Sequence, residues 1–504
     1  MKICFILQRR FAYIGHAMAL SFNKKYGVNE FCGYVYMRSS FNFLKSQPDI
    51  NYKKLLLDED IHKKYKDEKL DLDYLKYLEE EYGMPNLWPY IELDRVVRYN
   101  MLVREYPYNT PQYSHEEMIK IIQVKAKEII KFFEEEKPDA VIFSVIADIS
   151  TLLLYNIAKK KNIKIFFIQG VRINTRYSIT EQYYTLTYIE KTFIQIQEGK
   201  VAYPNHKKMA EKFLTDFRQK PSPYSSVDSP TTRPITRRKQ FNFLLPTKII
   251  NSLKWIIKTF TNYIFNDHRD DHYTIKPWYY VTDRAKRKIR VLIGFNDLYD
   301  KINLTEDFAF FPLQLEPEMS EMLFAPFYND PLWLIKQIAR SLPLNYKLYI
   351  KEHPSMFGYR PRRFYKALKK IPNVKLISPS IESFGLTKNA KIIITTAGTV
   401  GWEALLFKKP VITFGDVLYN KLSMVKRCRA IEDLPYLIKE QLENFNHNET
   451  ELLNLITAIY KESVDVDLVQ FWDIEGGGKI KENEQRFMPL VDLIAKKLNI
   501  QSIN

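Results

Sequence analysis

Residues 346–419 of the chain read YKLYIKEHPSMFGYRPRRFYKALKKIPNVKLISPSIESFGLTKNAKIIITTAGTVGWEALLFKKPVITFGDVLY. This segment holds four apolar runs that are too short for helices and lack polar alternation: 347–350, 374–377, 391–395 and 411–414. Such runs are typical of strands buried in a parallel sheet. Helical patterns separate them, so the segment predicts a doubly wound α/β domain, in which ligands bind beyond the carboxyl ends of the strands.

Two of these predicted strand ends carry polar residues suited to a ligand. Glu352, His353 and Pro354 follow the first run, and TTAGT at 395–399 precedes a predicted helix over 400–407. Free backbone N–H groups and the helix dipole at such a turn suit a phosphate, and Gly398 allows close approach. Alternatively, Thr396 or Thr399 caps the helix and His353 is a satisfied polar residue. The two strand ends together favour the ligand.

Several motifs here resemble the bacterial capsule polysaccharide biosynthesis family, whose characterised members include Kdo transferases of GT-B fold. The resemblance rests on KEHP at 351–354, TTAGTVGWEALLFKKPVITFG at 395–415, Tyr419, and FFPLQLEPEMS at 310–320. It covers residues 290–419 and extends to KPDAVIFSVIADIS at 137–150 and GVRINTRY at 170–177. Gln314 departs from the pattern, since many relatives carry a histidine there.

The resemblance implies nucleotide contacts from His353, Pro354, Thr395, Thr396 and Thr399. The predicted nucleotide-sugar site is completed by Lys351, Gly398, Glu403 and Glu318. Arg172 and Arg176 match a paired-arginine pattern of the family, and two guanidinium forks could hold an acidic sugar or a lipid phosphate of the acceptor. Solvated surface arginines are the alternative.

Composition limits the classes of function. The chain has 504 residues, 46% of them hydrophobic, and a formal net charge of +17. That charge favours anionic partners such as nucleotide donors, anionic glycans or an anionic lipid surface. Nucleic acid ranks lower because the sequence has no recognisable nucleic-acid module. Three scattered cysteines, the absence of a signal-peptide pattern and the absence of a long apolar run predict a cytoplasmic protein that does not cross the membrane.

The N-terminal part predicts a second Rossmann-like domain over residues 1–205, with a helical insertion at about 45–113. A strand at 3–7 leads through Gly15 and His16 into a helix, and a β-α-β unit covers 140–168. Asp148 lies between a strand and a helix of this unit. It is therefore either a helix N-cap or the general base for the acceptor hydroxyl, and His16 is the second candidate base.

The chain between the two domains changes in character. PSPYSSVDSPTTRPITRRKQ at 221–240 is typical of a linker, and an amphipathic helix carrying Lys248, Lys254 and Lys258 follows it. This helix, inside a linker region over 206–288, either lies on an anionic membrane surface or packs between domains. The second domain is expected over 289–480, beginning with a strand at 290–294. A C-terminal helix within 481–504 is expected to return to the first domain.

These observations predict an α/β, GT-B-like fold of two Rossmann-like domains facing a cleft. The expected function is transfer of a sugar, acidic and CMP-activated like Kdo, from a nucleotide donor to a surface or capsular polysaccharide or its lipid-linked precursor. Neither a cofactor nor a metal is expected, because a helix dipole and hydroxyls can hold the leaving phosphate. The alternatives are a nucleotide-sugar epimerase of similar fold and a non-catalytic glycan-binding or export-associated protein. A peripheral position at the inner membrane face is the expected location if the amphipathic helix meets lipid.

Overall fold

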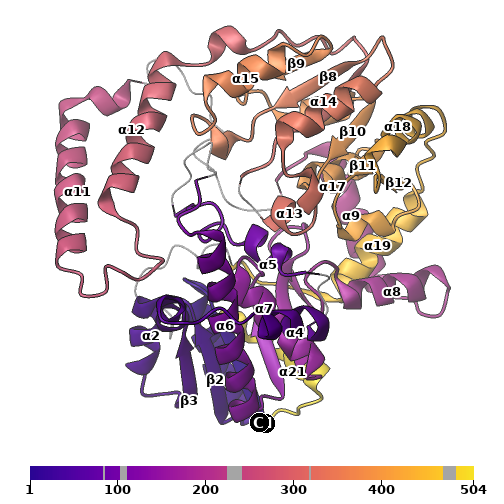
Figure 1. The fold of residues 1–504 in the computed structure, drawn as a ribbon. Helices are drawn as coiled ribbons and strands as arrows, with labels where there is room; N and C mark the ends of the chain where they lie inside the picture. The colour runs from indigo at the N-terminus through magenta and orange to yellow at the C-terminus, as the bar shows by residue number, and fades with distance from the viewer. Residues whose placement is uncertain (83–85, 103–109, 224–240, 317–318, 469–483, 504) are drawn as a thin grey trace.

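Two separate β-sheets organise the protein in the computed structural model (Figure 1). The structure describes residues 1–82, 86–102, 110–223, 241–316, 319–468 and 484–503. Each sheet is built mainly from parallel strands with helices between them, which confirms the predicted α/β class with two Rossmann-like units. The predicted return of the last helix to the first domain is also confirmed, since it packs against the first helix of the chain.

The first sheet has seven strands in the order β13-β6-β5-β4-β1-β2-β3. Its strands are β1 (Lys2–Leu7), β2 (Glu30–Val35), β3 (Tyr52–Leu57), β4 (Ala140–Phe143), β5 (Lys164–Gly170), β6 (Arg176–Thr180) and β13 (Ser463–Asp465). β6 runs antiparallel to both of its neighbours, and the remaining pairs are parallel. β3 corrects the prediction of a purely helical insertion at about 45–113. The lysines of this edge strand remain partly exposed, so its sequence lacks the apolar signal of a central strand.

The second sheet has six strands, all parallel, in the order β12-β11-β10-β7-β8-β9. They are β7 (Phe308–Pro312), β8 (Lys347–Lys351), β9 (Val374–Ile377), β10 (Ile392–Thr395), β11 (Val411–Thr413) and β12 (Val425–Arg427). The four apolar runs of residues 346–419 are thus β8, β9, β10 and β11. The carboxyl ends of β7, β8, β9 and β10 meet at one edge of the sheet, and polar residues of the predicted site follow β8 and β10.

Helices cover both faces of each sheet. Those whose sequence belongs to the first sheet are α1 (Phe11–Tyr26), α2 (Arg38–Lys45), α3 (Asp58–Lys63), α4 (Leu72–Glu81), α5 (Trp88–Leu93), α6 (His115–Glu136) and α7 (Ile149–Lys160). Those of the second sheet are α13 (Met319–Met322), α14 (Pro331–Ser341), α15 (Arg362–Lys369), α16 (Ser383–Asn389), α17 (Thr399–Leu406) and α18 (Leu434–Glu443). Each sheet thereby lies between two apolar layers of buried residues.

The chain crosses between the two units at places that the sequence did not mark. α8 (Thr187–Gln197) and α9 (Pro204–Gln219) precede residue 220 but pack against α19 (Glu449–Lys461), and Phe217 shares a core with Tyr349 of the second sheet. β13 then joins the first sheet before α21 (Met488–Leu498) packs on α1. The predicted limits at 205 and 480 therefore need correction, because α8 and α9 belong to the second unit's core and residues 463–465 belong to the first sheet.

A helical hairpin stands at one side of the molecule, formed by α11 (Pro246–Ile264) and α12 (Pro277–Ile293) (Figure 1). The predicted strand at 290–294 is wrong, because these residues are the end of α12 and the Gly294 that terminates it. The tip of the hairpin is anchored on the first domain, where Asp271 accepts a hydrogen bond from Arg38 at 2.9 Å. None of the described helices is long and apolar enough to span a membrane.

Candidate nucleotide-sugar site

The turn between β10 and α17 is held by contacts to its backbone. Gly398 N donates to Thr395 Oγ1 at 3.1 Å, and Gln314 Nε2 donates to the same oxygen at 3.2 Å. On the other side, the Tyr419 hydroxyl donates to the Gly398 carbonyl at 2.7 Å. Gly398 is the N-cap of α17, and no side chain caps this helix. The first N–H groups of α17 are therefore left for a ligand, contrary to the alternative that Thr396 or Thr399 caps them.

The turn after β8 is fixed by a buried charged network. Glu352 is 1% exposed; its carboxylate accepts hydrogen bonds from His353 N at 2.7 Å and from the Tyr365 hydroxyl at 2.7 Å. It also pairs with Arg360, a fully buried guanidinium that also contacts Glu316 at 2.5 Å and donates to the Gln314 carbonyl at 3.2 Å. His353 Nδ1 accepts from Ser355 N at 3.2 Å. The network explains why an acidic residue precedes His353: it orients the turn that carries the imidazole.

A cavity of about 750 Å³ lies between these two turns. Six of the predicted residues line it: Lys351, His353, Pro354, Gly398, Thr399 and Glu403. Thr395 and Thr396 do not line it, because both are buried beneath the turn, at 0% and 1% exposure. Thr395 thus positions the turn from below. Glu318 lies outside the described residues. The volume falls in the range of about 300–1,000 Å³ that small-molecule sites occupy.

Burial sets the charges of two residues in the cavity. Lys351 Nζ donates to Ser383 Oγ at 2.7 Å, and burial lowers the pKa of this lysine to about 8. Burial likewise raises the pKa of Glu403 to about 7, although the nearby Arg172 acts in the opposite direction. Lys351 is therefore mainly cationic at neutral pH, while Glu403 is close to its midpoint. An anionic ligand would find one clear cation and the start of α17 in this cavity.

The sequence missed the third wall of the cavity. Glu382 and Ser383 follow β9, and Glu382 caps α16 by accepting from Phe384 N at 2.8 Å and Gly385 N at 2.7 Å. Gln314, which follows β7, also lines the cavity. Because the carboxyl ends of parallel strands share an edge, the polar run SPSIES after β9 was a usable signal for these residues.

The two predicted acceptor arginines have different roles. Arg172, at a positive φ of 61°, reaches from the first domain and donates to the Ala397 carbonyl at 3.1 Å. It also lines a cavity between the domains together with Tyr183 and Asp416. Arg176 instead donates to Ser463 Oγ at 2.9 Å and ties β6 to β13. The pairing of the two arginines is therefore corrected: Arg172 lies at the interdomain cavity, and Arg176 holds the first sheet together.

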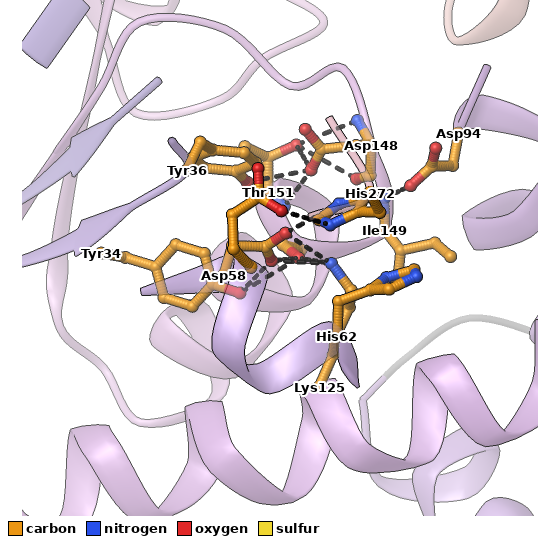
Figure 2. Close-up of polar contacts among 12 residues, drawn as sticks. Tyr34, Tyr36, Asp58, His62, Asp94, Lys125, Asp148, Ile149, Thr151 and His272 are labelled. Atoms are coloured by element: carbon orange, nitrogen blue, oxygen red, sulfur yellow. Dashed lines mark hydrogen bonds and ion pairs between the residues drawn. The ribbon is translucent and has the colours of Figure 1, made fainter. Parts of the chain in front are cut away.

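Asp148 forms the N-cap of α7 in a buried position at the edge of the first sheet (Figure 2). Its carboxylate accepts from Thr151 N at 2.8 Å and from the Tyr36 hydroxyl at 2.9 Å. Burial, reinforced by the negative charges of Asp94 and Asp58, raises its pKa to about 6. This geometry supports the role of Asp148 as the N-cap of α7. The role of Asp148 as the acceptor's base remains a prediction that only turnover can test.

His16 is not at the edge of the first sheet. It lies within α1 at 1% exposure, its Nδ1 is 3.1 Å from the Tyr52 hydroxyl, and its ring packs edge-on against Phe43 at 5.8 Å. An imidazole buried in this way cannot reach an acceptor hydroxyl. The prediction that His16 is a catalytic base is therefore corrected, and His16 is a packing residue.

The structure also reveals a polar network that the sequence did not predict (Figure 2). Asp58 is fully buried and accepts from Lys125 Nζ at 2.7 Å and Ser150 Oγ at 2.6 Å. His272 Nε2 lies 3.2 Å from the same carboxylate. Burial alone would raise the pKa of Asp58, but Lys125 and His272 hold it well below its usual value. Its partners come from segments far apart in the chain, so no local pattern marked it.

A comparison with known families matches residues 205–431 to the family described as "Capsule polysaccharide biosynthesis protein". Among curated proteins, "Protein FixF" of Sinorhizobium fredii is 33% identical over 135 residues, which are 26% of this chain and 31% of that protein. The aligned segment thus spans less than a third of that relative's length.

Solved structures show weaker similarity. Thermosulfurimonas dismutans KpsC, "beta Kdo 2,7 transferase", is 13% identical with a TM-score of 0.36, over 72% of this chain and 89% of that one. A Neisseria meningitidis UDP-GlcNAc 2-epimerase is 13% identical with a TM-score of 0.28, over 99% of both chains. TM-scores this low do not establish a shared activity. The family match does cover the second sheet through β12, so the segment 205–431 is similar to the capsule polysaccharide biosynthesis protein family that its motifs indicated.

Proposed function

We propose that the protein is a GT-B glycosyltransferase that moves a sugar from a nucleotide donor to a surface or capsular polysaccharide or to its lipid-linked precursor. The observation that carries the proposal is the cavity of about 750 Å³ where Lys351, His353 and the uncapped start of α17 converge. Glycosyl transfer requires a held leaving phosphate, and these groups are suited to hold one. The family match over residues 205–431 supports the same class of function.

The donor is an acidic, CMP-activated sugar similar to Kdo. This assignment follows from the family resemblance, and the two cations near the phosphate turn are compatible with an acidic sugar. Lys351 lines the cavity, and Arg172 reaches the turn from the first domain. Lys351 and the helix dipole can stabilise the charge that develops on the leaving phosphate, so neither a metal ion nor another cofactor takes part.

The acceptor approaches from the first domain, through the interdomain cavity that Arg172, Tyr183 and Asp416 line. Holding donor and acceptor in one geometry converts a bimolecular step into an effectively unimolecular one, and a cleft between two domains can accelerate the reaction in this way. Arg172 links the two sites, because it lines this cavity and its guanidinium donates to the Ala397 carbonyl in the turn of the donor cavity.

The protein works at an anionic membrane surface through α11. No residue of this helix is buried, and its outer face exposes Ile250, Leu253, Ile257 and Ile264 by 52–64%. The two helices of the hairpin carry eight Lys and Arg and one acidic residue. Apolar side chains beside cations are typical of helices that lie in a membrane interface. Trp255 is on the inner face, where Arg284 stacks on its ring at 3.6 Å. The double variant Ile250→Glu with Ile257→Glu on the outer face therefore tests membrane binding, and it should reduce sedimentation of the protein with anionic liposomes.

The decisive experiment offers the purified protein a panel of CMP- and UDP-sugars and measures nucleotide release with and without a glycolipid acceptor. Acceptor-dependent release from a CMP-sugar is the expected result. Interconversion of the sugar without acceptor would instead indicate an epimerase. Nucleotide binding with no turnover on any acceptor would indicate a non-catalytic glycan-binding or export-associated protein.

A further inference from the structure

A groove of about 720 Å³ runs along the inner face of the hairpin formed by α11 and α12. Its second wall is the segment 355–359, which directly follows His353 and Pro354 of the donor cavity. We call it the hairpin groove. Four cationic residues line it, with no acidic residue among the lining: Lys248, Arg284, Arg287 and Lys288.

These four cations have no carboxylate partner among the residues that the structure describes. Arg284 stacks on Trp255 at 3.6 Å, and Lys288 lies 5.0 Å from the centre of the Phe243 ring. Arg287 donates to the Tyr359 hydroxyl at 2.6 Å. Asp283 is the acidic residue of α12; it is 7% exposed, lines no part of the groove and forms no ion pair with them, although the charges of Arg287 and Arg284 oppose the burial that raises its pKa. Four positive charges thus share one groove that has no carboxylate among its lining residues.

The remaining lining defines the chemistry of the ligand. Five of the thirteen lining residues are aromatic or aliphatic, namely Phe243, Trp255, Val291, Phe357 and Tyr359. Guanidinium and ammonium groups recognise phosphate, and stacking on aromatic rings holds them in place before a ligand arrives. A ligand that is anionic at one end and apolar at the other satisfies both parts. The exposed apolar side chains lie on the outer face of the same helix, so α11 presents the groove on one side and an apolar face on the other.

We infer that the hairpin groove binds the phosphate headgroup of an anionic lipid, with its chains directed along α11. The binding step needs no donor and no turnover, so it can be tested apart from the proposed glycosyl transfer. The position of the hairpin groove nevertheless links lipid binding to the donor cavity. Ser355 lines the groove, while His353 two residues earlier lines the donor cavity. A lipid in the groove would therefore lie directly behind the turn that carries the His353 imidazole.

The test uses dihexanoyl phosphatidic acid as monomers, which removes the surface potential of a bilayer and leaves only the site. Its chainless equivalent is glycerol 3-phosphate, and dihexanoyl phosphatidylcholine provides the zwitterionic control. Binding is followed by calorimetry. The groove variant is Lys248→Gln with Lys288→Gln, and the matched control is Lys254→Gln with Lys258→Gln. The control removes two lysines of α11 that do not line the groove.

The expected result is that the groove variant weakens binding of dihexanoyl phosphatidic acid by about tenfold or more, since charge-assisted contacts to phosphate are lost. The control should bind as wild type does, and all three proteins should keep the same melting temperature. Glycerol 3-phosphate should bind at least about tenfold more weakly than the lipid. Equal losses in the two variants would overturn the site, and equal affinity for glycerol 3-phosphate would overturn its assignment to a lipid.

Discussion

The carboxyl edges of the two sheets are built from the same strand-turn-helix units, but their polar side chains are used differently. At the second sheet, Lys351, His353 and Thr399 line a cavity of about 750 Å³. At the first sheet, Asp58 and Lys125 are 0% and 1% exposed and bind each other (Figure 2). His272 from the hairpin tip completes this network from above.

The difference shows that a polar strand end is not by itself a ligand site. Buried polar groups must be hydrogen-bonded, and at the first sheet Lys125, Ser150 and His272 of the hairpin tip meet that requirement for Asp58. The second sheet instead holds its turns with groups beneath the cavity, such as Thr395 and Glu352. Other polar side chains of these turns are left at the surface of the cavity. Stability should therefore respond to mutations at the first edge, and nucleotide affinity to mutations at the second.

Asp58→Ala should cause the largest change in stability. It leaves the buried Lys125 ammonium without its carboxylate, which typically costs about 3–5 kcal/mol of the free energy of unfolding. Urea denaturation of the purified protein would measure this loss. Glu128→Ala, on the helix α6 that carries Lys125, is the matched control, because its partner Lys64 is 51% exposed and such surface pairs contribute about 1 kcal/mol or less. Similar losses in both variants would mean that the first edge is not a cooperative structural network.

Asp148→Asn should change how stability depends on pH. The folded-state pKa of about 6 exceeds the usual unfolded value of about 3.9, so the native state holds a proton that the unfolded state releases. The free energy of unfolding contributed by Asp148 is therefore highest below about pH 4 and falls by about 2–3 kcal/mol as pH rises to about 6. The asparagine variant lacks this fall, and it should gain stability relative to wild type over that window.

The same variant also separates the cap from the catalytic base. Asparagine caps a helix about as well as aspartate, so the cap predicts turnover near that of wild type. Loss of a general base would lower turnover by about 10²-fold or more with little change in nucleotide affinity. That second outcome would show that the first edge opens during the reaction and is catalytic, which would break the contrast between the two edges.

His353→Ala should act on binding alone. The imidazole lines the donor cavity, and a lost charge-assisted hydrogen bond to phosphate corresponds to about ten- to hundredfold in affinity. Calorimetric titration with CMP and UDP would measure it. The melting temperature should change little, because Glu352 and Arg360 hold the turn through buried contacts, while the imidazole adds the single hydrogen bond from Ser355 N at 3.2 Å described above. A folded variant with full nucleotide affinity would remove His353 from the donor site.

The sequence predicted the second sheet far better than the first, for a physical reason. Central parallel strands are buried on both faces, so β8 and β10 appear as continuous apolar runs, and their limits differ from the predicted ones by one residue. β3 is an edge strand with partly exposed lysines and gave no such signal. The strand predicted at 290–294 failed because a short apolar run cannot distinguish a strand from the end of a helix such as α12.

The residues of the candidate site were likewise predictable only where they lie next to strands that the sequence indicated. His353, Gly398 and Thr399 were predictable because each lies beside a strand end that the sequence already indicated. The network around Asp58 was not, since Lys125 and His272 lie 67 and 214 positions away and meet only through tertiary packing. Arg172 and Arg176 lie four residues apart, yet the positive φ of Arg172 turns the chain so that they serve different partners.

Glu403→Gln should produce the smallest change, an effect on nucleotide affinity at the carboxyl edge of the second sheet. Glu403 has a pKa near 7 because burial disfavours its charged form, so it is mostly neutral below that pH and mostly anionic above it. An anionic nucleotide in the same cavity should bind more weakly once Glu403 is charged, by up to about tenfold between pH 6 and 8. The nucleotide's own phosphate also titrates near pH 6, so the informative quantity is the difference between wild type and Glu403→Gln at each pH. We expect that difference to be small at low pH and to grow in favour of the glutamine variant as pH rises. The opposite trend, with wild type gaining affinity at high pH, would mean that the carboxylate accepts hydrogen bonds from the bound nucleotide, and that the carboxyl edge of the second sheet uses Glu403 as a ligand.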